Sequence, residues 1–361
     1  MRSVRWWAVL CSVVVAGAVA RGGDGPKEAT FEARHELEVA IPEGAQVVRI
    51  WFTQPQDDAA SDLGAMKVES TAGDAKPAKD NEGNAFLYWE LTKPAAGPFK
   101  ATTSFTITRK EVCANVDPAA TRAYAPADLK GMEKYLGATQ YVIIDDKITA
   151  LAKEIVGDEK NPTAASRLIY DWVLENIEYW VKDPSKLKAS TTGSTEHCLT
   201  TKTGNCTDFH SLYMSLSRAA GIPTRITYGS FFKGPLDGQD ADQSYHCWLE
   251  YYAPQVGWIP LDVAVADIFV DGVTLTEENK PKINLTVADG YAGPDPNMVD
   301  YYFGNIDERR VVWSHGRDLT LDPKQSGGPI NAMAKAYVEI DGKPFDGYKR
   351  KLTFKEIKKA P

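Results

Sequence analysis

The chain has 361 residues, enough for two domains of ordinary size, and 43% of them are hydrophobic and 25% charged, as in globular proteins with a buried core. The formal net charge of −8 argues against a nucleic-acid partner, which would favour a basic surface. The first segment combines Arg2 and Arg5 with an apolar run from Trp6 to Val15 and the small-x-small pattern at Ala18 to Ala20. This combination predicts a signal peptide over residues 1–20 and export to the periplasm or the extracellular space, without stable membrane insertion after cleavage. An uncleaved anchor is the alternative reading of this segment.

The segment after this leader has the pattern of a β-domain. Apolar and polar residues alternate from Phe31 to Ile41, which predicts a half-buried strand with His35 packed on its core side. Further strands are expected over 47–52, 66–70, 85–91 and 101–108, separated by clusters of Gly, Pro and Asp. We therefore expect an all-β, sandwich-like domain over residues 30–110, followed by a linker over 111–140.

The next part of the chain predicts helices and a core of mixed α+β class. Helical spacing of apolar residues indicates one helix over 145–156 and a second that begins at Asn161 and Pro162. We expect this core to span 141–265 and an irregular C-terminal extension to span 266–361. The polar loop 183–203 leads directly into the next helix, so it is expected to form one wall of a substrate groove.

The next helix is predicted to begin at Cys206. Asn205 is a plausible N-cap, and apolar residues recur at helical spacing from Phe209 to Ala220, before Gly221 and Pro223 end the helix. A cysteine in the first turn lies beside unpaired backbone amides and the positive end of the helix dipole. Both lower the pKa of a thiol, and the thiolate is the nucleophilic form, so Cys206 is a candidate nucleophile.

A base and an orienting carboxylate are predicted on a hairpin downstream. Residues 244–252 and 257–262 are rich in aromatic residues and predict two strands joined by a short loop. If residues 253–255 form the turn with Tyr252 opposite Val256, His246 lies directly opposite Asp262. Asp262 could then orient the His246 ring toward Cys206. Cys247, next to His246, should point to the opposite face and is expected to be a core or structural thiol.

Together these motifs resemble the transglutaminase-like superfamily. The resemblance rests on Gly-Asn-Cys-Thr-Asp-Phe at 204–209, Ser-Arg-Ala-Ala-Gly-Ile-Pro-Thr-Arg at 217–225, His-Cys-Trp at 246–248 and Gly-Trp-Ile-Pro-Leu-Asp at 257–262. It covers about a third of the chain. It implies a papain-like α+β core and a catalytic triad of Cys206, His246 and Asp262. The superfamily includes cross-linking enzymes, cysteine proteases, amidases and inactive relatives, so the resemblance leaves the reaction open.

The predicted chemistry is acyl transfer on protein or peptide amides through a thioester on Cys206. Water as the acceptor makes the enzyme a protease or amidase, which we favour because an exported enzyme meets water in excess, and a lysine amine makes it a cross-linker. The sequence has no HExxH, no spaced Cys-x-x-Cys pairs and no Asp-rich calcium loop, so no metal and no cofactor are expected. Two alternatives stay open: a non-catalytic exported binding or scaffold protein, and a structural protein in which Cys206 forms a disulfide with Cys113, Cys198 or Cys247.

Overall fold

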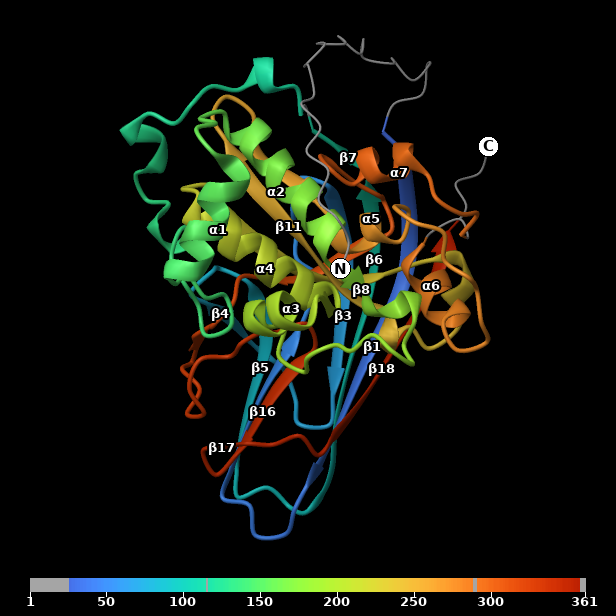
Figure 1. Cartoon of the computed structure of the whole chain (residues 1–361). Helices are drawn as coiled ribbons and strands as arrows, with labels where there is room; N and C mark the ends of the chain where they lie inside the picture. Colours follow the sequence, from blue (N-terminus) through green and yellow to red (C-terminus); the bar gives the residue numbers. More distant parts are fainter. Residues whose placement is uncertain (1–25, 115, 288–290, 358–361) are drawn as a thin grey trace.

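The structure of the protein is a computed structural model that describes residues 26–114, 116–287 and 291–357; the predicted signal peptide over 1–20 lies outside these residues. Figure 1 shows two parts of different character, a group of helices packed on a sheet and a long strand-rich body below it. The predicted α+β class, with a strand-rich N-terminal region, is confirmed. None of the described helices is both long and apolar enough to cross a membrane.

Two sheets form the strand-rich body. The first has the order β18-β1-β6-β3 and is built from Tyr348–Ile357, Glu28–Ile41, Gly97–Lys110 and Ser61–Ser70. The second has the order β15-β4-β5-β2-β16-β17 and is built from Leu321–Asp322, Lys76–Asp80, Ala85–Thr92, Val47–Thr53, Ala336–Ile340 and Lys343–Pro344. Buried residues of both sheets form one hydrophobic cluster, which includes Val39, Ile50, Trp89 and Phe99, so the sheets pack face to face as a sandwich.

Both ends of the described chain contribute to this sandwich. Strand β18 runs antiparallel to β1, with Leu352 opposite His35, and β16 runs antiparallel to β2, with Val338 opposite Ile50. Without these strands, β1 and β2 would each expose an unpaired row of backbone groups. The C-terminal segment that the sequence predicted as an extension therefore supplies strands to the sandwich.

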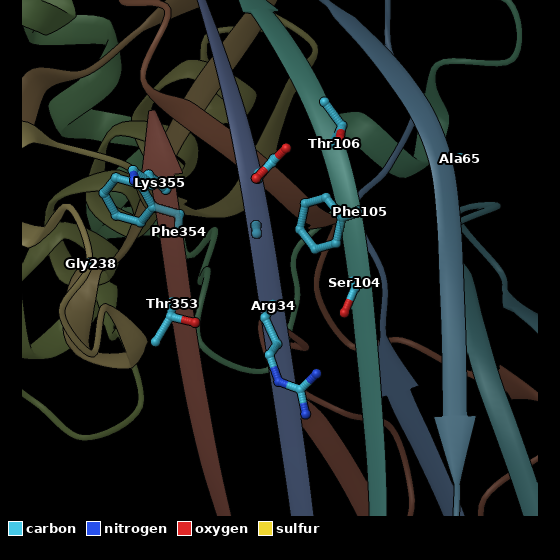
Figure 2. Close-up of a pocket in the computed structure, with 11 residues that line it drawn as sticks. Arg34, Ala65, Ser104, Phe105, Thr106, Gly238, Thr353, Phe354 and Lys355 are labelled. Atoms are coloured by element: carbon cyan, nitrogen blue, oxygen red, sulfur yellow. The ribbon is translucent and has the colours of Figure 1, made fainter. Parts of the chain in front are cut away.

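The outer face of the first sheet is polar. Figure 2 shows Arg34, Ser104, Thr106 and Thr353 on three neighbouring strands of this face. These residues help to line a hollow of about 580 Å³, and none of its lining residues is a cysteine or a histidine. The alternation of polar and buried residues along β1 explains this face, because successive side chains of a strand point to opposite sides.

The helical part is built on a sheet of order β12-β11-β10-β14, formed by Gly257–Leu261, Tyr245–Ala253, Thr224–Phe231 and Arg310–His315. Helices α1 to α7 span Asp146–Val156, Pro162–Asn176, Thr195–Thr201, Cys206–Ala219, Val263–Asp267, Lys280–Thr286 and Pro296–Tyr301. Figure 1 shows α1, α2, α3 and α4 gathered over β11. Almost every residue of α4 is buried, including Phe209, Leu212 and Leu216, so this helix is the centre of the core.

Short elements connect these parts. The parallel strands β8 and β9 span Glu178–Tyr179 and Thr203–Gly204, and the antiparallel strands β7 and β13 span Val112–Cys113 and Asn305–Ile306. Short 3-10 helices lie at Pro118–Ala120, Pro126–Leu129, Glu133–Tyr135, Trp180–Lys182, Gly234–Leu236 and Asp242–Ser244. The first three belong to the segment 111–140 that was predicted as a linker, and Tyr124 of this segment donates a hydrogen bond to the carbonyl of Tyr252.

The hairpin register differs from the prediction. Ala253 pairs with Gly257 and Leu249 with Leu261, so the turn contains residues 254–256 and the pairing is shifted by two residues. The positive φ angles of Gln255 and Gly257, 77° and 99°, place the turn one residue later than expected. His246 therefore has no residue directly opposite it on β12, and Asp262 lies beyond the strand, at the start of α5.

Candidate active site

Cys206 is the first residue of α4, as the sequence predicted. The side chain of Asn205 accepts a hydrogen bond from the Asp208 amide at 3.0 Å, and the Asp208 carboxylate accepts one from the Asn205 amide at 2.9 Å. This reciprocal capping box fixes the point at which the helix begins. The Cys206 side chain is thereby held in the first turn, where backbone amides have no partner within the helix.

The loop 183–203 is attached to the same helix end. The Asp208 carboxylate also accepts hydrogen bonds from the amides of Ser190 at 2.9 Å and Ser194 at 2.7 Å. The loop is thus anchored behind the site, and none of its residues lines the cavity at Cys206, so the expectation that it forms a groove wall was wrong. The cavity has a volume of about 300 Å³ and is lined by Tyr179, Trp180, Val181, Asn205, Cys206, Phe231, Gln243, Ser244, Tyr245, His246, Lys282, Leu285 and Thr286.

His246 and Asp262 come together although their predicted pairing was wrong. Nε2 of His246 lies 2.8 Å from Oδ2 of Asp262, because Asp262 turns back toward the sheet as the N-cap of α5. One face of the His246 ring is covered by Phe231, whose ring stacks on it with centroids 4.4 Å apart. These contacts leave Nδ1 of His246 as the nitrogen that faces away from the carboxylate.

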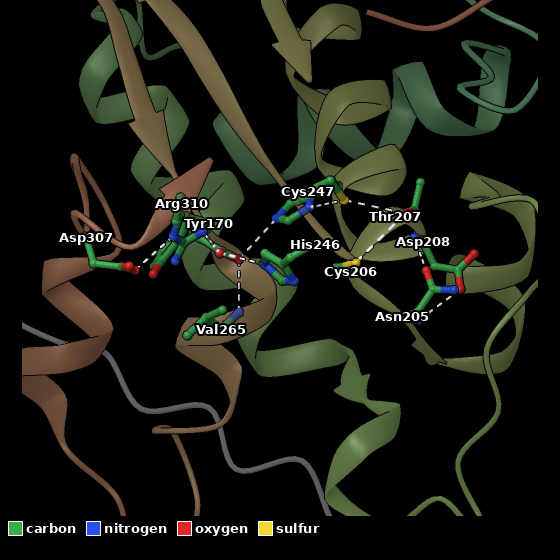
Figure 3. A network of polar contacts seen from close by, with 12 residues as sticks. Tyr170, Asn205, Cys206, Thr207, Asp208, His246, Cys247, Val265, Asp307 and Arg310 are labelled. Atoms are coloured by element: carbon green, nitrogen blue, oxygen red, sulfur yellow. Dashed lines mark hydrogen bonds and ion pairs between the residues drawn. The ribbon is translucent and has the colours of Figure 1, made fainter. Parts of the chain in front are cut away.

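The remaining side of the His246 ring faces Cys206 (Figure 3), and each side chain shifts the pKa of the other. Burial alone would lower the pKa of His246, but the charges of Asp262 and Cys206 outweigh it and raise that pKa above the ordinary value. A hydrogen bond from Cys247, together with the charge of His246, lowers the pKa of Cys206 well below that of an ordinary thiol, against the effect of burial. The arrangement favours a thiolate beside an imidazolium.

Asp262 has more partners than the sequence indicated. Arg310 is fully buried, and its Nη1 lies 2.5 Å from the Oδ2 atom that also binds His246. The second oxygen, Oδ1, accepts a hydrogen bond from the Val265 amide at 3.0 Å and lies 3.4 Å from Nε2 of His210. Burial opposes ionisation, but His246, Arg310 and His210 together hold the pKa of Asp262 well below its ordinary value. The carboxylate therefore stays charged.

Cys247 lies nearer the site than predicted. Its sulfur is 3.5 Å from the Thr207 hydroxyl, which also contacts the Cys206 sulfur at 3.9 Å, and 3.2 Å from Nδ1 of His210. The expected alternation of His246 and Cys247 is compatible with this placement, because the face that carries Cys247 is the one that α4 covers. Cys247 is fully buried in the main hydrophobic core, as expected of a core thiol, and it lies close to the site because Cys206 begins α4.

The part of the chain that contains Cys206, His246 and Asp262 matches a known protein family. Residues 149–263 match the family model of the transglutaminase-like superfamily. The chain has a transglutaminase-like core. The matched residues begin inside α1 and end at the first residue of α5, so they include Cys206, His246 and Asp262.

Similar proteins extend over more of the chain than the family model. A protein of unassigned function from Haemophilus influenzae is 26% identical over 340 residues, which cover 88% of each chain. The protein YebA of Bacillus subtilis is 25% identical over 146 residues, 37% of this chain and 20% of YebA. The crystal structure of a presumed cysteine protease from Cytophaga hutchinsonii superposes with a TM-score of 0.52 at 18% identity, covering 91% of this chain and 98% of that one. This last likeness shows a shared fold.

The other cysteines and tryptophans near the transglutaminase-like core have structural positions. No disulfide joins the described cysteines, which are Cys113, Cys198, Cys206 and Cys247. Trp248 packs with Ile306 and Val312 and lies outside the cavity, whereas Trp180 lines it. Within the described ranges, no group of three or more His, Cys, Asp or Glu side chains is arranged to hold a metal ion.

Three residues of the transglutaminase-like site were missed from the sequence. His210 follows Cys206 by four residues, and this helical spacing, which places both on one face of α4, was a usable signal. Arg310 lies on β14, far from the other residues along the chain, and no local pattern marks it. Tyr179, which lines the same cavity as Cys206, was equally hidden, since it lies in the two-residue strand β8.

Proposed function

We propose that the protein is an exported enzyme that transfers acyl groups from protein or peptide amides through a triad of Cys206, His246 and Asp262. The observation that carries the proposal is the position of the His246 ring. Nε2 of the ring lies 2.8 Å from Oδ2 of Asp262 on one side, and the ring faces Cys206 on the other. Cys206 and His246 also line the same cavity, so a substrate bound there meets the thiol and the imidazole together.

The reaction follows from these three groups. The Cys206 thiolate adds to the amide carbonyl, and the backbone amide of Cys206 at the start of α4 is a candidate donor to the oxyanion. His246 gives its proton to the leaving amine, and a thioester on Cys206 remains. His246 then takes a proton from the acceptor as the acceptor attacks the thioester, while Asp262 stabilises the imidazolium. Water as acceptor gives hydrolysis, and a primary amine gives cross-linking.

We favour hydrolysis over amine transfer. An exported enzyme meets water in large excess, and transfer to an amine requires that water be kept from the thioester. The cavity of about 300 Å³ is at the lower end of the range for ligand sites, so it accommodates one or two residues of a peptide.

Export is inferred from the sequence of residues 1–20. Its test is the mass of the protein recovered from a culture, which is expected to show that the chain begins after Ala20.

The decisive experiment uses a peptide library together with a tagged primary amine. New peptide termini identify hydrolysis, and incorporation of the tag identifies transfer. Cys206→Ala should abolish both, whereas Cys198→Ala, which changes a buried thiol on α3 outside the cavity, should leave the products unchanged. If the wild-type protein gives neither product, and Cys206 reacts with a thiol reagent no faster than it does in His246→Ala, the binding or scaffold alternative is favoured instead.

A further inference from the structure

A second cysteine–histidine pair lies behind the proposed triad. The Cys247 sulfur is 3.2 Å from Nδ1 of His210, and Nε2 of His210 is 3.4 Å from Oδ1 of Asp262. In the triad, His246 contacts the other carboxylate oxygen of Asp262. Asp262 thus lies next to the histidines of two pairs, Cys206 with His246 and Cys247 with His210.

The second pair has no access to the cavity. Cys247 and His210 are fully buried, and neither lines the space in front of Cys206. Burial, together with the neighbouring Cys206 sulfur, raises the pKa of the Cys247 thiol well above its ordinary value. Cys247 therefore keeps its proton at neutral pH and is a hydrogen-bond donor rather than a nucleophile.

The two sulfurs contact the same hydroxyl group, that of Thr207. The Thr207 hydroxyl lies 3.5 Å from the Cys247 sulfur and 3.9 Å from the Cys206 sulfur. Tyr245 in turn places its hydroxyl 3.0 Å from that of Thr207 (Figure 3 shows Thr207 beside both cysteines). Because Thr207 belongs to α4 and Tyr245 to β11, these contacts fix the distance between the helix and the strand that carry the thiols.

We propose that Cys247 is a positioning residue whose thiol donates a hydrogen bond to the sulfur of Cys206 and so holds Cys206 as the thiolate. This arrangement requires a proton on Nδ1 of His210, which then donates to the Cys247 sulfur, 3.2 Å away, and leaves the Cys247 proton for Cys206. A His210 protonated only at Nε2, toward Asp262, would accept the Cys247 proton instead, and the alkylation of Cys206 would then not depend on Cys247. A hydrogen bond to an ionised acceptor is stronger than one between neutral groups, and a buried site strengthens it further. The inference rests on the proposed role of Cys206 as the nucleophile.

The test measures the thiolate directly and needs no substrate. The rate at which iodoacetamide alkylates Cys206 is followed by mass spectrometry of the peptide that contains it, over a range of pH. Four proteins are compared: wild type, Cys247→Ala, Cys247→Ser and the control Cys198→Ala. Serine keeps a hydroxyl donor where alanine has none, so the two variants at position 247 separate the hydrogen bond from the packing.

In Cys247→Ala the pH midpoint of alkylation is expected to rise by about one unit, which slows alkylation roughly tenfold on the acid side of the midpoint. Cys247→Ser and Cys198→Ala should keep the wild-type midpoint. If circular dichroism shows that Cys247→Ala does not fold, Cys247→Val, which fills the site without a donor, takes its place and should show the same rise.

Two results would overturn the inference. One is an unchanged midpoint in the variant without a donor, and the other is an equal rise in Cys247→Ser, which would assign the effect to side-chain volume. The result is separable from the proposed function. Turnover of a peptide with no change of midpoint rejects only the role of Cys247, whereas the expected rise without any turnover rejects only the enzymatic activity.

Discussion

Two cysteine–histidine pairs meet at Asp262, and they differ in what surrounds the sulfur. Cys206 opens onto a cavity, and its pKa is lowered by the hydrogen bond from Cys247 and by His246. Cys247 is enclosed, and burial raises its pKa. The same two residue types therefore produce a candidate nucleophile at one position and a protonated donor at the other, because access and neighbouring charge differ.

The carboxylate itself is divided between the pairs. Oδ2 of Asp262 contacts His246 and Arg310, whereas Oδ1 accepts from the Val265 amide and lies near His210. The shorter contact and the cation are on the side of His246. The role of each pair is therefore set by partners outside the pair. Substitution of these groups one at a time tests the difference between the pairs.

Removing each of the two sulfurs in turn gives the largest expected difference in turnover. Cys206→Ala should lower turnover by a factor on the order of 10⁴ or more, because it removes the atom that forms the thioester. Cys247→Ala should lower it by at most about tenfold, as expected from a change in thiolate population alone. The measurement is kcat/KM on any peptide that the library assay identifies. Comparable losses in the two variants would contradict the division of roles.

The two histidines give the next comparison. His246→Gln should reduce kcat/KM by roughly 10²–10⁴, because glutamine fills the position but cannot take and return a proton. His210→Gln should cost about tenfold or less, since His210 touches the nucleophile only through Cys247 and Asp262 keeps His246 and Arg310. It should also raise the pH midpoint of Cys206 alkylation. Equal losses of kcat/KM, with no shift of the midpoint in His210→Gln, would show that the second pair has a different task.

The sequence predicted the position of Cys206 at the start of α4 better than the positions of His246 and Asp262, and the reason is the range of the contacts. Asn205, Cys206 and the apolar spacing of α4 are local signals, so the start of the helix was found. His246 and Asp262 were found as residues, but their register was wrong because the turn depends on backbone angles at Gln255 and Gly257. The predicted contact between His246 and Asp262 is present, although the strand register from which it was predicted is not.

Long-range partners could not be predicted in this way. Arg310 reaches Asp262 only because β14 pairs with β10, and β18 joins β1 across most of the chain length. Such pairings depend on which strand edges remain free after the whole fold has formed. The strands of the sandwich were expected from their alternation, whereas the contribution of the C-terminal strands to it was not.

Removal of Arg310 tests the divided carboxylate. Arg310→Met should destabilise the protein by about 3–5 kcal/mol, because Asp262 and Asp307 lose their shared buried cation. Lys186→Met, which removes an exposed ion pair with Asp183, should leave the free energy of unfolding almost unchanged, because solvent screens this pair. Chemical denaturation measures both free energies of unfolding. A loss for Arg310→Met no larger than that of the surface control would mean that His246 and His210 hold the carboxylate without the arginine.

The smallest expected effect concerns a carboxylate that neither pair touches. Asp267 is the last residue of α5, buried, with one oxygen 2.8 Å from Lys182 and no imidazole partner. Burial raises its pKa to about 7, in contrast to Asp262 at the other end of the same helix. The folded protein therefore binds a proton that the unfolded chain has released, so this contribution to stability is complete below about pH 4 and is lost as the pH rises through 7.

Asp267→Asn should remove that loss. Between pH 5 and pH 8 the variant should gain about 2–3 kcal/mol of unfolding free energy relative to wild type, whereas Asp158→Asn, at an exposed position, should show no such trend. Asp262 makes no contribution of this kind in the same window, because its lowered pKa confines its effect to more acidic solutions. A difference between Asp267→Asn and wild type that stays constant with pH would mean that Lys182 keeps Asp267 ionised throughout. In that case burial would not decide the charge of either Asp262 or Asp267. The imidazoles and Arg310 around Asp262 would then not be the reason that the two carboxylates differ in pKa.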